Sequence, residues 1–108
     1  MEQVKLDFIK KAIEDKKGEE IEIFDVSTTS PICSYIVIAT VLNPRHASAV
    51  ADAVIEASEK LNQPVRHKEG DQTCPWILID LSDIIVHLFT KEERNRVNLE
   101  HLIKQVNN

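Results

Sequence analysis

The sequence has very little glycine and cysteine, with two residues of each among its 108. With two glycines, the chain has no glycine-rich loop of the kind that holds the phosphates of a nucleotide. Cys33 and Cys74 stand alone, and the four histidines are scattered, so no group has the spacing of zinc ligands. We therefore expect no metal site and no cofactor. Two thiols without a signal peptide indicate a reduced, cytoplasmic protein.

A long apolar run is also absent. The longest, Tyr35–Leu42, is far shorter than the ~20 residues that a membrane-spanning helix needs. Charged residues interrupt the apolar residues of the N-terminal segment, which is not typical of a signal peptide. The sequence thus predicts no direct contact with a membrane.

Basic residues are fewer than acidic ones, 13 against 18, which gives a net charge of −5. This balance disfavours a protein that binds free nucleic acid, because phosphate binding usually needs a basic face. The shortage of basic residues is in the central part of the sequence, since residues 19–90 carry four basic and eleven acidic side chains, a net charge of −7. An acidic centre favours a basic partner, although a solvated surface is the plainer alternative.

What the sequence does contain is a regular succession of helix and strand patterns. Apolar residues at helical spacing predict a first helix over residues 2–17. Its buried face would consist of Val4, Phe8, Ile9, Ala12 and Ile13. Asn43 as N-cap and Pro44 at the first helical position begin a second helix, and a third is expected over residues 92–106.

Patterns rich in β-branched residues predict the sheet. The expected strands are residues 20–26, 34–41, 64–68, 76–80 and 83–89. The sequence therefore predicts one domain over residues 1–108 of the α+β class, with about five strands in a mixed sheet and three helices in the order α-β-β-α-β-β-β-α. The strand-helix-strand segment around residues 34–68 would be a crossover connection.

Two aspartates, Asp80 and Asp83, bracket the short turn of the expected hairpin. Paired carboxylates can bind Mg²⁺ or act as an acid–base pair. Aspartate is also a common turn residue, and this interpretation is favoured because no phosphate-binding loop accompanies the pair.

Four further residues are candidates for a site. His87 faces away from its neighbours Val86 and Leu88, as a proton-transfer group or as a hydrogen-bonded, half-buried histidine. Arg45 and His46 lie in the first turn of the second helix, where backbone N–H groups can bind an anion. Trp76 follows Pro75 at the start of a strand and either caps the core or serves as an interface residue.

Three segments together resemble one family. They are YIVIATVLNPRHASAVADAVIE, EGDQTCPWILIDLSDIIVHLF and RNRVNLEHLI, and they stand in the family's order over nearly the whole chain. In these segments the sequence resembles the Iojap family, the ribosome-silencing factors. It departs from the family where an aromatic residue is usual near Val97 and a tryptophan near Ile103.

The resemblance implies a translation repressor without enzymatic activity. Such a protein binds the large ribosomal subunit through its L fourteen protein and blocks docking of the small subunit when nutrients are scarce. The implied fold is similar to that of nucleotidyltransferases, without their Gly-Ser loop and catalytic aspartate pair. Family members are often dimers, so a homodimer is among the implied states.

We accordingly expect a partner-binding surface with Trp76 at its centre. Its other expected residues are Glu69, Asp80, Asp83, His87, Arg45 and His46. Two alternatives stay open: a metal-dependent nucleotidyl- or phosphoryl-transfer enzyme that uses Asp80 and Asp83, and a homodimeric adaptor that does not bind ribosomes.

Overall fold

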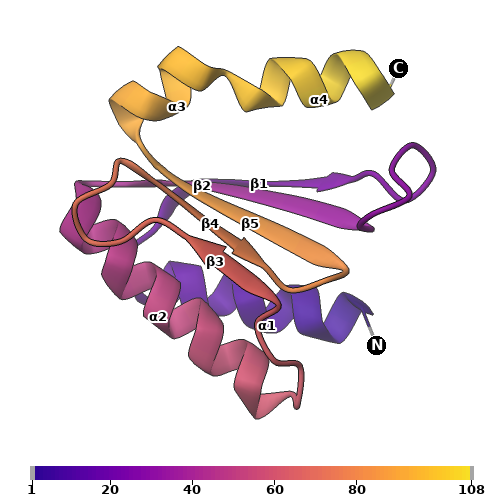
Figure 1. Ribbon diagram of the computed structural model, residues 1–108, viewed down its shortest axis with the longest axis horizontal. Helices are drawn as coiled ribbons and strands as arrows, with labels where there is room; N and C mark the ends of the chain where they lie inside the picture. The colour runs from indigo at the N-terminus through magenta and orange to yellow at the C-terminus, as the bar shows by residue number, and fades with distance from the viewer. Residues whose placement is uncertain (1, 108) are drawn as a thin grey trace.

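The computed structural model describes residues 2–107, which form a five-stranded sheet between two layers of helices (Figure 1). The helices are α1 (Glu2–Asp15), α2 (Pro44–Lys60), α3 (Lys91–Val97) and α4 (Leu99–Asn107). The strands are β1 (Glu19–Asp25), β2 (Tyr35–Val41), β3 (His67–Glu69), β4 (Trp76–Asp80) and β5 (Ile84–Thr90). No helix within residues 2–107 is long and apolar enough to cross a membrane.

The strand order in the sheet is β1-β2-β5-β4-β3. Only β2 and β5 pair in parallel, and the other three neighbouring pairs are antiparallel. The mixed α+β class with five strands is therefore confirmed. Because β4 is antiparallel to both β5 and β3, β3 runs parallel to β2, so β2, α2 and β3 form a crossover connection as predicted.

The helices divide the sheet into two faces (Figure 1). Helices α1 and α2 pack on the first face, where the larger core cluster includes Ile9, Val50 and Val86. Helices α3 and α4 lie on the second face, where a smaller cluster forms around Phe89 and Ile103. Central strand β2 contributes to both clusters, which explains its run of apolar residues without polar alternation.

The buried face predicted for α1 is partly wrong. Ile9 and Ile13 are fully buried, but Val4 and Phe8 are 51% and 45% exposed. Lys5 is buried instead, because its ammonium group donates to the Leu81 carbonyl at 2.9 Å and to the Asp83 carboxylate at 2.6 Å. These two bonds tie α1 to the β4–β5 turn and place Lys5 on the buried face of the helix, which apolar spacing cannot reveal.

The single closing helix predicted over residues 92–106 is in fact two helices, so the chain has four in residues 2–107. Asn98 separates them with a left-handed backbone (φ 50°), and its N–H donates to the Arg94 carbonyl. Asparagine tolerates this conformation better than most residues, so it can end α3 and start α4 at once.

Other expected boundaries are close to those observed. The Asn43 side chain caps α2 by accepting from the His46 N–H at 2.8 Å, and Pro44 opens the helix as predicted. Strand β3 is shorter than expected and excludes Pro64, which has no N–H to donate to a ladder.

Candidate functional site

The strand register arranges the side chains of the second face in rows, because directly paired residues point to the same side of a sheet. The outer row consists of Phe24, Ile36, Ile85, Asp80 and His67. The middle row consists of Glu22, Ile38, His87, Leu78 and Glu69. The Trp76 row consists of Thr40, Phe89 and Trp76. Residues far apart in the chain thus become neighbours.

Helices α3 and α4 cover only part of these rows. Their apolar residues pack on the β1–β2 side, with Ile103 buried against a cluster that contains Val26 and Ile38. On the β4–β3 side, Leu78 and Asp80 are only partly buried, and His67 and Glu69 are exposed. We call this side, made of Trp76, Leu78, Asp80, His67 and Glu69, the open half of the second face.

Trp76 lies at the border between the covered and open parts. Its ring packs on Phe89 with centroids 4.8 Å apart, and its indole N–H donates to Nδ1 of His87 at 3.1 Å. The side chain is nevertheless only partly buried. Trp76 therefore packs against the core, as one of the two alternatives predicts, and stays partly accessible, while its role as an interface residue remains a prediction.

His87 holds Trp76 in place. Its side chain is 7% exposed, and burial lowers its pKa from 6.5 to about 4. The imidazole is therefore neutral near pH 7, and its unprotonated Nδ1 can accept the indole N–H. The geometry favours the structural interpretation of His87, as a positioning residue for Trp76, over proton transfer.

Gly70 allows the β3–β4 loop to pass close to Trp76. Its φ is +97°, and a Cβ at this position would lie 2.7 Å from the Trp76 carbonyl oxygen. The loop that follows is folded by Asp71, whose carboxylate accepts from the side chain and the backbone of Thr73, and these bonds lower the pKa of Asp71. Gly70 and the Asp71 turn thus shape the loop that leads into β4 and Trp76.

The two aspartates of the hairpin are held by different partners. Asp80 accepts from the Ser82 N–H at 2.8 Å within the turn, where Ser82 has a φ of 79°. Asp83 forms an ion pair with Lys5 at 2.6 Å on the side of the first face. No group of three or more potential metal ligands occurs among the described residues. The geometry favours the turn interpretation over a catalytic pair.

Arg45 and His46 lie apart from the second face, at the start of α2. Arg45 is exposed. Nδ1 of His46 accepts from the Leu42 N–H at 2.9 Å, so Nε2 carries the proton and donates to the Lys16 carbonyl at 2.7 Å. His46 therefore ties the end of α1 to the start of α2, and nothing in its surroundings indicates a bound anion.

Of the seven residues expected at a site, the structure brings four together on or beside the open half. These are Trp76, Glu69, Asp80 and His87. Asp83, Arg45 and His46 are placed elsewhere and have partners or positions of their own. Their role in binding stays a prediction.

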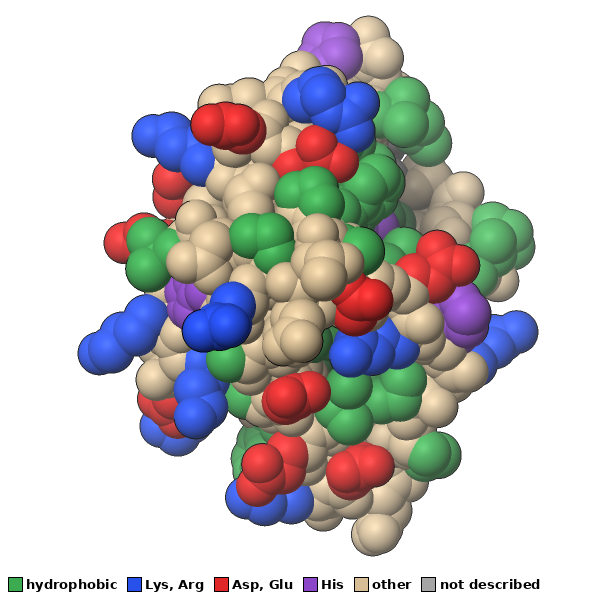
Figure 2. Space-filling view, turned by 60° about the vertical axis from the view of Figure 1, so that its left-hand side comes forward, with side chains coloured by type: hydrophobic (Ala, Val, Ile, Leu, Met, Phe, Trp, Pro, Cys, Tyr) green, Lys and Arg blue, Asp and Glu red, His purple; other side chains and the backbone are tan. Residues whose placement is uncertain are grey.

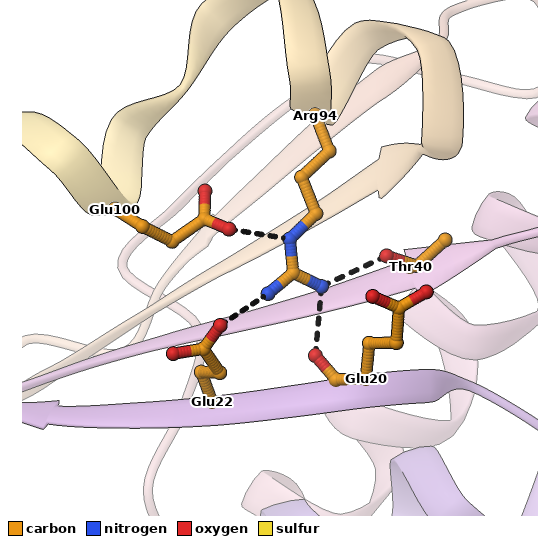
Figure 3. Close-up of polar contacts among 5 residues, drawn as sticks. All are labelled: Glu20, Glu22, Thr40, Arg94 and Glu100. Carbon is orange, nitrogen blue, oxygen red and sulfur yellow. Dashed lines mark hydrogen bonds and ion pairs between the residues drawn. The ribbon is translucent and has the colours of Figure 1, made fainter.

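Sequence reasoning missed the structural role of Arg94, which is 6% exposed (Figure 3). Its guanidinium donates to the carboxylates of Glu100 and Glu22, at 2.8 and 3.1 Å, and to Thr40 and the Glu20 carbonyl, at 2.8 and 2.7 Å. Burial alone would raise the pKa of Glu100, but the bond to Arg94 holds it below its usual value. Three of the four partners lie 54 or more residues away, so no local pattern signals the cluster.

The side of the molecule with α3, the β3–β4 loop and the start of α2 shows no large region of one charge (Figure 2). Acidic, basic and hydrophobic side chains are interspersed there. A surface of this kind suits a protein partner, which can match apolar and charged groups together, better than it suits a phosphate chain.

Comparison with known proteins points to one family. The family described as "Ribosomal silencing factor during starvation" matches residues 2–108. A ribosomal silencing factor of Haemophilus influenzae is 33% identical over 97 residues, 90% of this chain and 95% of its own length. One from Bacillus subtilis is 32% identical over 91 residues, 84% of this chain and 77% of its own length.

Solved structures show the same fold. A protein from Chromobacterium violaceum superposes with a TM-score of 0.91 at 25% identity, covering 94% of this chain and 85% of its own. A protein from Bacillus halodurans superposes with a TM-score of 0.83 at 29% identity, covering 93% of both chains. The arrangement of sheet and helices is therefore shared with these proteins.

Proposed function

The chain belongs to the ribosomal silencing factor family, and on that premise we propose that it binds the large ribosomal subunit through its L fourteen protein. Bound there, the protein occupies the surface where the small subunit docks. Translation is then repressed by steric exclusion, under nutrient limitation and in the cytoplasm.

The open half of the second face is the observation that carries this proposal. It combines the partly buried ring of Trp76 with the acidic side chains of Glu69 and Asp80 on two adjacent strands. Tryptophan is enriched among residues that contribute most to protein interfaces. Acidic neighbours would guide a basic ribosomal protein toward it and fix its orientation.

The size of the molecule is consistent with this mechanism. A typical interface buries about 800 Å² on each partner, which is about an eighth of this protein's surface of 6385 Å². The open half and the adjoining β3–β4 loop would supply such an area. The rest of the molecule would then obstruct the approach of the small subunit. Exclusion of the small subunit needs no reaction.

Cosedimentation with isolated ribosomal subunits tests the proposal. We expect the protein to migrate with large subunits and not with small ones, and we expect Trp76→Ala to weaken binding at least tenfold, as for a central interface residue. Circular dichroism would check that the variant is folded. Absence of the wild-type protein from the large-subunit fractions would contradict the proposal.

The enzymatic alternative has a separate test. A transferase that uses Asp80 and Asp83 would be stabilised by Mg²⁺ and a nucleotide in a saturable way, because ligands that bind only the native state raise its melting temperature. We expect no such shift, since Asp83 is paired with Lys5 on the side of the first face whereas Asp80 lies on the second face.

A further inference from the structure

Helix α4 carries an apolar stripe that the fold only partly uses. The stripe consists of Leu99, Leu102, Ile103 and Val106, at helical spacing. Ile103 is buried, but Leu102 is 57% exposed and Val106 is 61% exposed. Leu99 and Ile103 therefore pack on the sheet, while Leu102 and Val106 extend beyond what the sheet covers.

A groove lies between this stripe and the sheet. Its volume is about 240 Å³, and besides the α4 stripe it is lined by Ile36 of β2 and by Val26, Thr29 and Ser30 of the β1–β2 loop. We call it the α4 groove. Because its lining is almost entirely apolar, the group that fits it is an apolar side chain rather than an ion or a polar ligand.

The α4 groove is continuous with the open half of the second face. Ile36, in the groove lining, is paired with Ile85, which is paired with Asp80. Ile36, Ile85 and Asp80 are all only partly buried. A partner segment that crosses the outer row would thus pass from the acidic side chains of the open half to the apolar groove without leaving the surface.

We propose that the α4 groove receives an apolar side chain of the same basic partner protein that the open half binds. The inference rests on the proposed function and adds a second contact to it. The occupant is a segment in which an apolar residue is flanked by lysine or arginine, since Asp80 and Glu69 would pair with the basic residues. A second copy of this chain fits less well, because it would bring the same acidic side chains toward the open half.

Leu102→Gln tests the groove directly. Glutamine keeps helix propensity close to that of leucine but removes the apolar group. The matched control is Leu42→Gln, since Leu42 is 76% exposed, follows the end of β2 and is not part of the groove lining. Equilibrium binding to isolated large subunits is measured for both variants, for Leu102→Met, which stays apolar, and for Val106→Gln, the second groove variant.

We expect Leu102→Gln and Val106→Gln to bind about tenfold more weakly, as for loss of a buried apolar contact, and Leu42→Gln and Leu102→Met to bind as the wild type does. Both groove residues are more than half exposed, so the thermal unfolding of these variants should stay near that of the wild type. Unchanged binding by both groove variants would overturn the inference while the proposed function stands. Failure of the wild-type protein to bind large subunits would overturn both.

Discussion

At the scale of single residues, the fold depends on a few polar groups that are buried with partners from distant segments. Arg94 and Lys5 join elements that are far apart in the sequence, whereas His87 joins the consecutive strands β4 and β5 through its bond with Trp76. A buried polar group whose partner is removed costs more than an exposed one, because its desolvation is no longer compensated. These residues are therefore the sensitive points of the molecule, and two of them give direct predictions.

Replacement of Arg94 by Met should destabilise the fold by about 3 kcal/mol, the lower end of the range for breaking a buried ion pair, because Glu22 is partly exposed and can rehydrate. Glu100 would keep a largely buried carboxylate without its partner. Urea unfolding measures the change. Arg94→Lys should lower the free energy of unfolding by less, since lysine keeps the positive charge. Some loss remains because lysine lacks the planar set of donors. Equal stability of Arg94→Met and the wild type would contradict this account.

His87 should make stability depend on pH. Its pKa is lowered to about 4 in the folded state, whereas in the unfolded state it is near 6.5, so the unfolded chain binds the proton first. The contribution of neutral His87 to the free energy of unfolding is therefore fully present above pH 6.5. It decreases as the pH falls toward 4 and does not change further below pH 4. Between pH 7 and pH 5 the loss should be about 2 kcal/mol.

The measurement is urea unfolding of the wild type and of His87→Gln at both pH values. Glu93 and Glu100 have lowered pKa values, and their effect begins only below their ordinary value of 4.5. The chosen window thus separates the effect of His87 from that of these two carboxylates. The variant should show a clearly smaller change with pH, and an equal change in the two proteins would assign the effect to other groups.

At the scale of elements, local signals predicted most boundaries and long-range contacts decided the rest. The start of α2 was predictable because Asn43 and Pro44 act on their own neighbours. The buried face of α1 was not, since the partners of Lys5 lie 76 and 78 residues away. The break at Asn98 was not predicted, because the apolar stripe that indicated the closing helix lies entirely after it and α3 adds only Val97 as an apolar residue.

In the candidate site, too, local sequence features were predictable and long-range contacts were not. Trp76, Asp80 and His87 could be selected from the sequence because a lone tryptophan, a turn and an alternating strand are local features. The grouping of Glu69 with them depends on β3 pairing with β4, and the separation of Asp83 depends on Lys5. Sequence reasoning therefore supplied the candidates, and only the register decided which of them are neighbours.

The ion pair between α1 and the β4–β5 turn makes Asp83 a structural residue in our account. Charge reversal in Asp83→Lys would place a second cation beside Lys5, whose side chain is 4% exposed. We expect a loss of about 3 kcal/mol or more in urea unfolding, as for a broken buried pair. The double variant Lys5→Met, Asp83→Asn should be more stable than the single one. A fully stable Asp83→Lys protein would instead favour a role for Asp83 at the partner surface.

At the scale of the whole molecule, the two faces of the sheet have different tasks. The first face is covered by α1 and α2 and contains the larger core cluster. The second face is only partly covered, and this leaves the open half and the α4 groove on one side of the molecule. Stability and binding can thus be changed by different sets of residues, which makes the proposed function testable with folded variants.

The central claim is that the acidic open half holds the large subunit and so prevents subunit joining. The most direct measurement is the fraction of joined ribosomes, formed from isolated subunits, as the protein concentration rises. It compares the wild type with Glu69→Lys and with the matched control Glu59→Lys, since both glutamates are exposed but Glu59 lies on α2. We predict that the wild type and Glu59→Lys inhibit joining equally and that Glu69→Lys needs about tenfold more protein. Equal inhibition by all three proteins, or none by the wild type, would contradict the claim.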